Sequence, residues 1–253
     1  MAILEVKDCT KRFGGLVAVR NLNMSLNRGD LYGLIGPNGA GKTTVFNLMT
    51  GVYTPDEGSI ELDGRPIHKQ KPSTIARLGM SRTFQNIRLF RSMTVLENVM
   101  LARHMRKTQG LFDAILRTPR LNKEETGIRH DALELLNIFT LDKRADEPAV
   151  NLPYGSQRRL EIARALATDP KVLLLDEPAA GMNSQESLEL MHLIRSLRDR
   201  FQITILLVEH NMKVVMGVCE KIQVIDYGET IALGTPKEIQ GNPKVIEAYL
   251  GGA

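Results

Sequence analysis

Residues 36–44, Gly-Pro-Asn-Gly-Ala-Gly-Lys-Thr-Thr, constrain this chain more than any other segment. They fit the phosphate-binding pattern G-x-x-x-x-G-K-[ST], and the apolar segment Leu31–Ile35 precedes them. Glycines are needed because the loop wraps backbone N–H groups around a phosphate, which requires positive φ angles and close approach. Residues 42–50 are predicted to form a helix whose N-terminal dipole adds to this anion site.

The loop residues have distinct expected roles. Lys42 is expected to reach the β- and γ-phosphate oxygens, and the Thr43 hydroxyl is expected to bind Mg²⁺. The alternative, a glycine-rich structural turn, is disfavoured because chance produces the pattern in roughly one chain per hundred of this length. The residues expected to hold the nucleotide phosphates are Gly36, Asn38, Gly39, Ala40, Gly41, Lys42, Thr43 and Thr44.

The composition, with 43% hydrophobic and 25% charged residues, is that of an ordinary globular protein. We expect a cytoplasmic location, because no apolar run approaches the ~18 residues of a membrane span and residues 1–10 lack the long apolar core of a signal peptide. Cys9 and Cys219 are too isolated for a disulfide framework or a zinc site.

The net charge of the chain is +4. The basic segment between Arg103 and Arg129 lacks alternating aromatics, which favours a solvated or membrane-adjacent face over nucleic-acid binding.

The pattern of apolar residues changes twice along the chain. Short strands are predicted in the first thirty residues and at 59–63, helices at 94–167, and buried strands at 172–175 and 203–208 with an amphipathic helix, 187–199, between them. Apolar strands that alternate with helices predict a parallel α/β sheet covered on both faces. We expect a single domain in which a sheet core, about 1–90 and 168–253, carries an inserted helical subdomain, about 91–167.

The apolar strand 172–175 ends in two acidic residues, Asp176 and Glu177. Asp176 is expected at the carboxyl end of the sheet, where it can hold Mg²⁺ through water or through Thr43. Glu177 is placed to accept a proton from an attacking water as general base. Strands often end in solvated acids, so this signal is strong only together with the phosphate loop.

Two further polar residues, Gln85 and His210, follow short apolar segments. Gln85 would serve as a ligand of Mg²⁺ or of the attacking water, and His210 would hydrogen-bond a γ-phosphate. Each has a plainer alternative, as a polar residue that ends a strand or as an ordinary loop residue. The residues by themselves leave both interpretations open.

Residues 151–166, Asn-Leu-Pro-Tyr-Gly-Ser-Gln-Arg-Arg-Leu-Glu-Ile-Ala-Arg-Ala-Leu, resemble the signature segment of the ATP-binding subunits of ABC transporters. The other segments of that family occur in the expected order: the phosphate loop, Gln85, Asp176-Glu177-Pro178, the D-loop position 180–183 and His210. Phe13 lies where the family places an aromatic that stacks on adenine, and an apolar strand residue is the alternative there. The resemblance covers essentially the whole chain.

This resemblance implies a P-loop NTPase fold of the RecA-like type, with a mostly parallel sheet core, an N-terminal antiparallel β subdomain and an inserted helical subdomain. It implies a head-to-tail dimer, with a second copy or a related ATPase, in which Gly155 and Ser156 bind in trans the ATP held by the partner. Lys42, Gln85 and His210 would surround the γ-phosphate, and Mg²⁺ would be held by Thr43, Gln85 and Asp176. The implied partners are two integral-membrane permease subunits at the inner face of the cell membrane and, indirectly, an extracytoplasmic solute-binding protein.

Four segments resemble one subgroup, the ATPases of branched-chain amino acid importers: residues 81–90, residues 179–183, the helical insertion after Arg103, and the ending 245–251. An ATPase of a lipid or lipopolysaccharide exporter and a soluble, non-transport ABC ATPase are the alternatives. Arg88, Leu89 and Phe90 either contact the membrane subunits or pack inside the helical lobe.

The signature departs from the family pattern at three positions. Pro153 replaces the serine that donates to the partner's γ-phosphate, Tyr154 replaces the first glycine, and Ser156 replaces the glutamine. Gly155 is retained, so backbone donors at a helix N-terminus remain to bind the phosphate. Asn183 likewise replaces the usual aspartate of the D-loop, keeping polarity but losing charge.

We expect the substitution Pro153→Ser to raise ATPase activity, because it restores a hydroxyl and an N–H donor at the helix start. Steady-state turnover and nucleotide affinity of the two proteins provide the measurement. Equal values for both would mean that the trans contact at this position is unimportant here.

Overall fold

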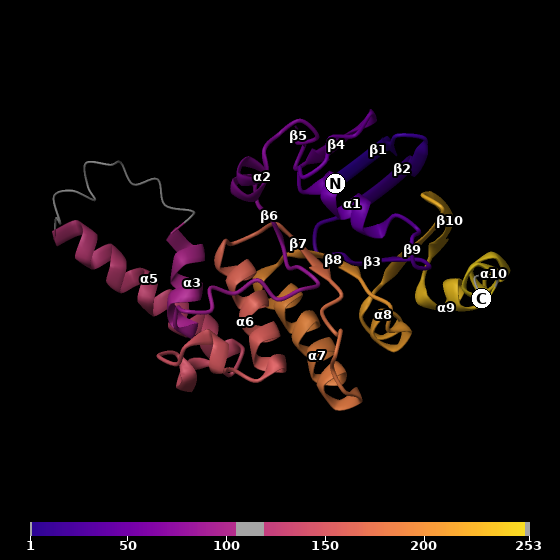
Figure 1. Ribbon diagram of the computed structural model, residues 1–253. Helices are drawn as coiled ribbons and strands as arrows, with labels where there is room; N and C mark the ends of the chain where they lie inside the picture. The colour runs from indigo at the N-terminus through magenta and orange to yellow at the C-terminus, as the bar shows by residue number, and fades with distance from the viewer. Residues whose placement is uncertain (1, 105–118, 251–253) are drawn as a thin grey trace. The chain divides into compact units, whose positions relative to one another are not determined.

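The computed structural model describes residues 2–104 and 119–250 (Figure 1). The chain divides into two compact units, one formed by Met1–Gln85 with Lys171–Ala253 and the other by Asn86–Pro170. The insertion after Arg103, used above for the subgroup resemblance, lies largely outside the described residues. Among the described residues, no helix combines the length and the apolar character needed to cross a membrane.

The first unit is built on a six-stranded sheet with the order β10-β9-β3-β8-β7-β6. Its strands are β3 (Leu31–Ile35), β6 (Met80–Arg82), β7 (Val172–Asp176), β8 (Thr204–Val208), β9 (Lys221–Asp226) and β10 (Glu229–Gly234). All neighbouring pairs are parallel except β9 with β10. Every residue of β3, β7 and β8 is buried, as expected of strands covered on both faces. The predicted mostly parallel core is confirmed.

An antiparallel sheet with the order β2-β1-β4-β5 forms the rest of the strand structure in this unit. It comprises β1 (Ala2–Phe13), β2 (Leu16–Asn27), β4 (Glu57–Leu62) and β5 (Arg65–Pro66). Its buried face joins one apolar cluster with helix α1 (Lys42–Met49) and with residues of β7 and β8. Helix α1 therefore lies between the two sheets (Figure 1), and this packing fixes the segment that follows the phosphate loop.

Further helices belong to the first unit. They are α2 (Pro72–Leu78), α7 (Ser184–Phe201), α8 (Met212–Val218), α9 (Pro236–Gln240) and α10 (Pro243–Leu250). Leu190, Ile194 and Leu197 of α7 are buried, which confirms the predicted apolar face. The periodicity of the sequence did not indicate β9, β10 or the helices after them.

The second unit is helical. It contains α3 (Val95–His104), α5 (Pro119–Ile138) and α6 (Tyr154–Ala167), with short 3₁₀ turns η1 (Asp142–Arg144) and η2 (Ala149–Asn151). Helix α3 packs against both α5 and α6. Pro119 stands at the first position of α5, where a missing N–H costs no hydrogen bond. Buried Val99, Ile128 and Leu160 contribute to its core.

Asn183 has a structural function at the start of α7. Its side chain accepts a hydrogen bond from the Glu186 N–H at 2.9 Å, and the Glu186 carboxylate accepts one from the Asn183 N–H at 2.9 Å. This reciprocal pair is a capping box, which satisfies two N–H groups that the helix leaves unpaired.

We expect Asn183→Ala to lower the free energy of unfolding by about 1 kcal/mol, since the cap is lost. Asn183→Asp keeps an acceptor at the same place and should stay close to the wild type. Urea unfolding followed by circular dichroism measures both variants. Equal unfolding midpoints for the alanine and aspartate variants would contradict the capping function.

Candidate active site

The phosphate loop has the backbone geometry that its sequence predicts. Gly39 and Gly41 have φ angles of 82° and 102°, in the left-handed region that favours glycine. A Cβ at Gly41 would lie 2.4 Å from the carbonyl oxygen of Ala18, so only glycine fits against β2. A Cβ at Gly39 would meet nothing within 4 Å, which shows that this side of the loop is open.

Helix α1 begins directly after Gly41, and no side chain caps its first turn. Its leading N–H groups and its dipole are thus directed at the loop, an arrangement that suits a phosphate. Lys42 is buried, and its ammonium donates to the carbonyl oxygens of Gly36 and Pro37, both at 2.8 Å. Burial lowers the pKa of Lys42, while the charges of Glu177 and Asp176 act in the opposite direction.

The oxygen donors at this end of the sheet fit a magnesium ion in their chemistry. Thr43 is exposed in the first turn of α1, and Asp176 ends β7. Hydroxyl and carboxylate oxygens are hard donors of the kind that Mg²⁺ binds together with water and phosphate oxygens. Among the described residues, no cluster of three or more His, Cys, Asp or Glu side chains forms a protein-only metal site. These donors therefore suit an ion that shares its ligands with a nucleotide.

Asp176 has a cationic partner that the sequence did not indicate. The Arg82 guanidinium donates to its Oδ2 at 2.6 Å, and both side chains are less than a tenth exposed. Arg82 also donates to Asn47 Oδ1 at 2.7 Å and lies over the rings of Phe46 and Phe84. A planar, permanently charged guanidinium is suited to a paired and stacked site of this kind. Arg82 thereby orients the carboxylate at the end of β7.

Glu177 lies between two other predicted residues, Gln85 and His210. The Gln85 amide donates to Glu177 Oε2 at 2.8 Å, and His210 Nε2 is 2.7 Å from Glu177 Oε1. Glu177 has a φ of 48°, and its N–H donates to the Val208 carbonyl at 2.8 Å. The structure thus brings the side chains of Gln85, Glu177 and His210 together just after the end of β7.

Phe13 ends β1 and is 42% exposed. Its ring makes a T-shaped contact with the ring of Tyr53, with centroids 5.1 Å apart, and the Lys11 ammonium lies 5.6 Å from the Phe13 centroid. A half-exposed aromatic face of this kind can receive a base. Phe13 is thus an apolar residue of a strand, as the alternative from the sequence has it, and its ring also retains exposed surface.

The signature residues begin helix α6 in the second unit. Pro153 is the N-cap residue, Tyr154 is the first helical residue, and no side chain caps the helix. Gly155 and Ser156 occupy the first turn and are half-buried. Farther along α6, Arg158 is fully buried and donates to Glu161 at 2.7 Å. The first turn of α6 thus leaves its leading backbone N–H groups without a capping side chain.

The segment 88–90 is only partly packed within the helical unit. Arg88 is exposed, yet its N–H donates to Glu161 at 3.3 Å. Phe90 is 47% exposed, and the Arg164 guanidinium lies over its ring, 5.5 Å from the ring centroid. Leu89 is half-buried. These residues retain accessible surface although their backbone is held by the unit.

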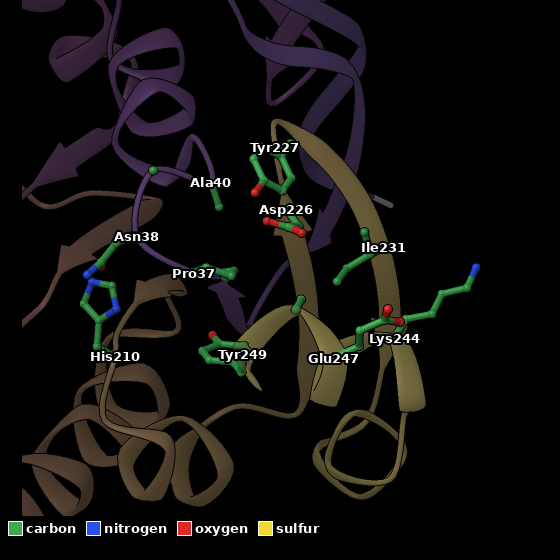
Figure 2. A pocket seen from close by; sticks show the side chains of 13 residues that line it. Pro37, Asn38, Ala40, His210, Asp226, Tyr227, Ile231, Lys244, Glu247 and Tyr249 are labelled. Atoms are coloured by element: carbon green, nitrogen blue, oxygen red, sulfur yellow. The ribbon is translucent and has the colours of Figure 1, made fainter. Parts of the chain in front are cut away.

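A cavity of about 910 Å³ opens beside the phosphate loop. It is lined by Gly36–Ala40, His210, residues of the turn between β9 and β10, and residues of α10. Figure 2 shows the side chain of Asn38 directed toward His210 and the Tyr249 ring close to Pro37. Burial raises the pKa of the Tyr249 hydroxyl, and a hydrogen bond with the backbone of Gly36 opposes that shift. The C-terminal helix thus borders the phosphate loop directly.

Known proteins resemble this chain along its whole length. The ATP-binding protein LivG for high-affinity branched-chain amino acid transport from Salmonella typhimurium is 49% identical over 251 residues, 99% of this chain and 98% of LivG. The lipopolysaccharide export system ATP-binding protein LptB from Acidithiobacillus ferridurans is 36% identical over 249 residues. The matched region spans 98% of this chain and 97% of LptB.

A solved structure has the same architecture. The ADP conformation of MJ1267, an ATP-binding cassette of an ABC transporter, matches with a TM-score of 0.86 and 31% identity, covering 99% of both chains.

Two family models match the sequence itself. The model for ABC transporters matches residues 19–180, from β2 to the turn after Glu177, and the model for branched-chain amino acid ATP-binding cassette transporters matches residues 229–253. The first match spans more than half of the chain and includes the phosphate loop, the signature segment and the Asp176-Glu177 pair. The chain belongs to the ABC transporter family of ATPases.

Proposed function

We propose that this chain is the ATP-hydrolysing subunit of an ABC importer for branched-chain or related amino acids. The observation that carries the proposal is the Glu177 carboxylate, held between the Gln85 amide and the His210 imidazole at the edge that also bears the phosphate loop. The high identity to LivG and the match of residues 229–253 support the transport of branched-chain amino acids.

In this proposal the loop residues bind ATP and the acidic residues act on water. The N–H groups of residues 39–44 and the Lys42 ammonium bind the phosphates, with Thr43, Gln85 and Asp176 as the residues that would hold Mg²⁺. The ion supplies charge neutralisation of the phosphate oxygens when it is bound. Glu177 accepts a proton from the attacking water, and His210 donates a hydrogen bond toward the γ-phosphate.

The site requires a second ATPase subunit. Gly155 and Ser156 at the first turn of α6 would supply phosphate contacts to the nucleotide held by a partner, which is either a second copy or a related chain. Two integral-membrane permease subunits would anchor the pair at the cytoplasmic face of the membrane, with an extracytoplasmic solute-binding protein acting through them. The accessible surface of Arg88 and Phe90 supports a contact with the permease subunits.

An exporter function is the second candidate, and one observation favours it: the similarity to LptB extends over 98% of this chain. The lower identity, 36% against 49% for LivG, places it behind the importer. A nucleic-acid function has less support, because the basic segment between Arg103 and Arg129 lacks the alternating aromatics of a stacking platform.

Gene deletion tests the proposed function. In the organism that encodes this chain, we expect the deletion to reduce uptake of radiolabelled leucine, isoleucine or valine at low external concentration. A copy of the wild-type gene should restore uptake, and a copy with Glu177→Gln should not, since a general base contributes roughly 10²-fold or more to hydrolysis. Unchanged uptake together with loss of lipopolysaccharide transport would support the exporter instead.

We expect Phe13→Ala to weaken ATP binding about tenfold, because stacking of a base on an aromatic ring contributes ~1–3 kcal/mol. Leu188→Ala, which trims an exposed apolar side chain on α7, is the control and should leave affinity unchanged. Titration with a fluorescent ATP analogue measures both variants. Equal affinities would rule out the stacking role of Phe13.

A further inference from the structure

Glu209, the residue after β8, is a buried acid that the proposed chemistry does not use. It is 3% exposed, and it follows the wholly buried strand that leads to His210. Its Oε1 accepts a hydrogen bond from the Ala179 N–H at 2.6 Å. Its Oε2 accepts from the N–H groups of His210 at 3.0 Å and Asn211 at 3.2 Å. Both oxygens are thus engaged by backbone donors from two separate loops.

Three backbone donors explain how this carboxyl group tolerates burial. Burial raises the pKa of Glu209, and the amides of Ala179, Asn211 and His210 oppose that shift by binding the ionised form. A carboxylate is suited to this place because both of its oxygens only accept hydrogen bonds. A glutamine at this position would place its NH₂ group, which is a donor, opposite the backbone N–H donors of one of the two loops, and those hydrogen bonds would be lost.

The two loops that Glu209 joins carry the catalytic groups of the proposed site. Ala179 belongs to the turn that begins at Glu177, whose carbonyl accepts from the Ala180 N–H at 3.1 Å. His210 belongs to the other loop, and its ring meets the Glu177 carboxylate at 2.7 Å. A closed ring of contacts therefore runs from Glu209 through the turn to Glu177, across to His210 and back to Glu209.

Glu209 is not needed to start the next helix. Helix α8 has Asn211 as its N-cap, and the Asn211 side chain accepts from the Lys213 N–H at 3.1 Å. The hydrogen bond from Ala179 joins positions thirty residues apart in the sequence, so it does not serve local turn formation. The Glu209 carboxylate therefore connects the two loops.

We propose that Glu209 is a positioning residue for ATP hydrolysis, which holds the His210 loop against the turn that carries Glu177 and so fixes the spacing of these two side chains. The inference rests on the proposed hydrolytic function. The hydrogen bonds described for Glu209 come from backbone N–H groups of these two loops and not from the phosphate loop. Its influence passes through the backbone of Ala179 and of His210.

The test measures ATP hydrolysis and ATP affinity of Glu209→Gln, Glu209→Asp and a control, Glu238→Gln. Glu238 also accepts a backbone hydrogen bond, from Thr235 at 2.7 Å, but it lies in the capping box of α9. We expect Glu209→Gln to lower kcat about tenfold or more, because small displacements of catalytic groups are costly, while the affinity for ATP changes less than about twofold. Glu209→Asp should be intermediate, and Glu238→Gln should match the wild type.

A double-mutant cycle with His210→Ala separates positioning from general loss of structure. Single-turnover measurements with excess enzyme give the residual rates. If Glu209 acts through His210, adding Glu209→Gln to His210→Ala should reduce the rate little further. An equal reduction in both backgrounds would overturn the proposal, as would an unchanged kcat in a folded Glu209→Gln protein.

Two further outcomes are decisive. If Glu209→Gln does not fold, Glu209→Asp decides, and a wild-type kcat in that variant would refute the positioning role because the shorter side chain cannot reach both loops. If the wild-type protein shows no hydrolysis that Glu177→Gln removes, the proposed function itself fails. That result differs from one in which the wild type hydrolyses ATP and the Glu209 variants do so equally well.

Discussion

The contact between Gly41 and the carbonyl oxygen of Ala18 in β2 is the constraint on which the phosphate site depends. A side chain at this position would collide with the strand, so the loop requires a glycine with a positive φ angle here. That turn determines where α1 begins and hence where its first N–H groups point. The antiparallel sheet therefore supports the nucleotide site as well as the fold, because β2 is the surface against which the loop is formed.

Much of this arrangement could be predicted from the sequence because the signals are local. The spacing of glycines with Lys42 and Thr43 indicates a loop with one known geometry. The apolar run that ends in Asp176 indicates a buried strand and its polar end. Parallel strands place their carboxyl ends at one edge, so the approach of Glu177 to His210 follows once both strands belong to one sheet.

Other features could not be predicted because they depend on partners distant in the sequence. In the sequence, nothing separates Arg82 from the other charged residues. Its contacts with Asp176, Asn47 and two aromatic rings are evident only in the folded structure. Glu209 next to His210 has the pattern of a solvated strand end, yet it is buried and bound by amides of two loops. The strand β9 pairs with β3, which lies far earlier in the chain, and periodicity carries no information about such pairing.

The cavity beside the phosphate loop has a consequence for genetic studies of transport. Its walls come both from Gly36–Ala40, within the general ABC transporter match, and from Lys244, Glu247 and Tyr249, within the branched-chain subgroup match. The part of the chain that the branched-chain model matches thus adjoins the part that the general ABC transporter model matches. Substitutions in α10 recovered in a screen for impaired uptake should accordingly be sorted by nucleotide affinity before they are interpreted as defects in the coupling of hydrolysis to transport.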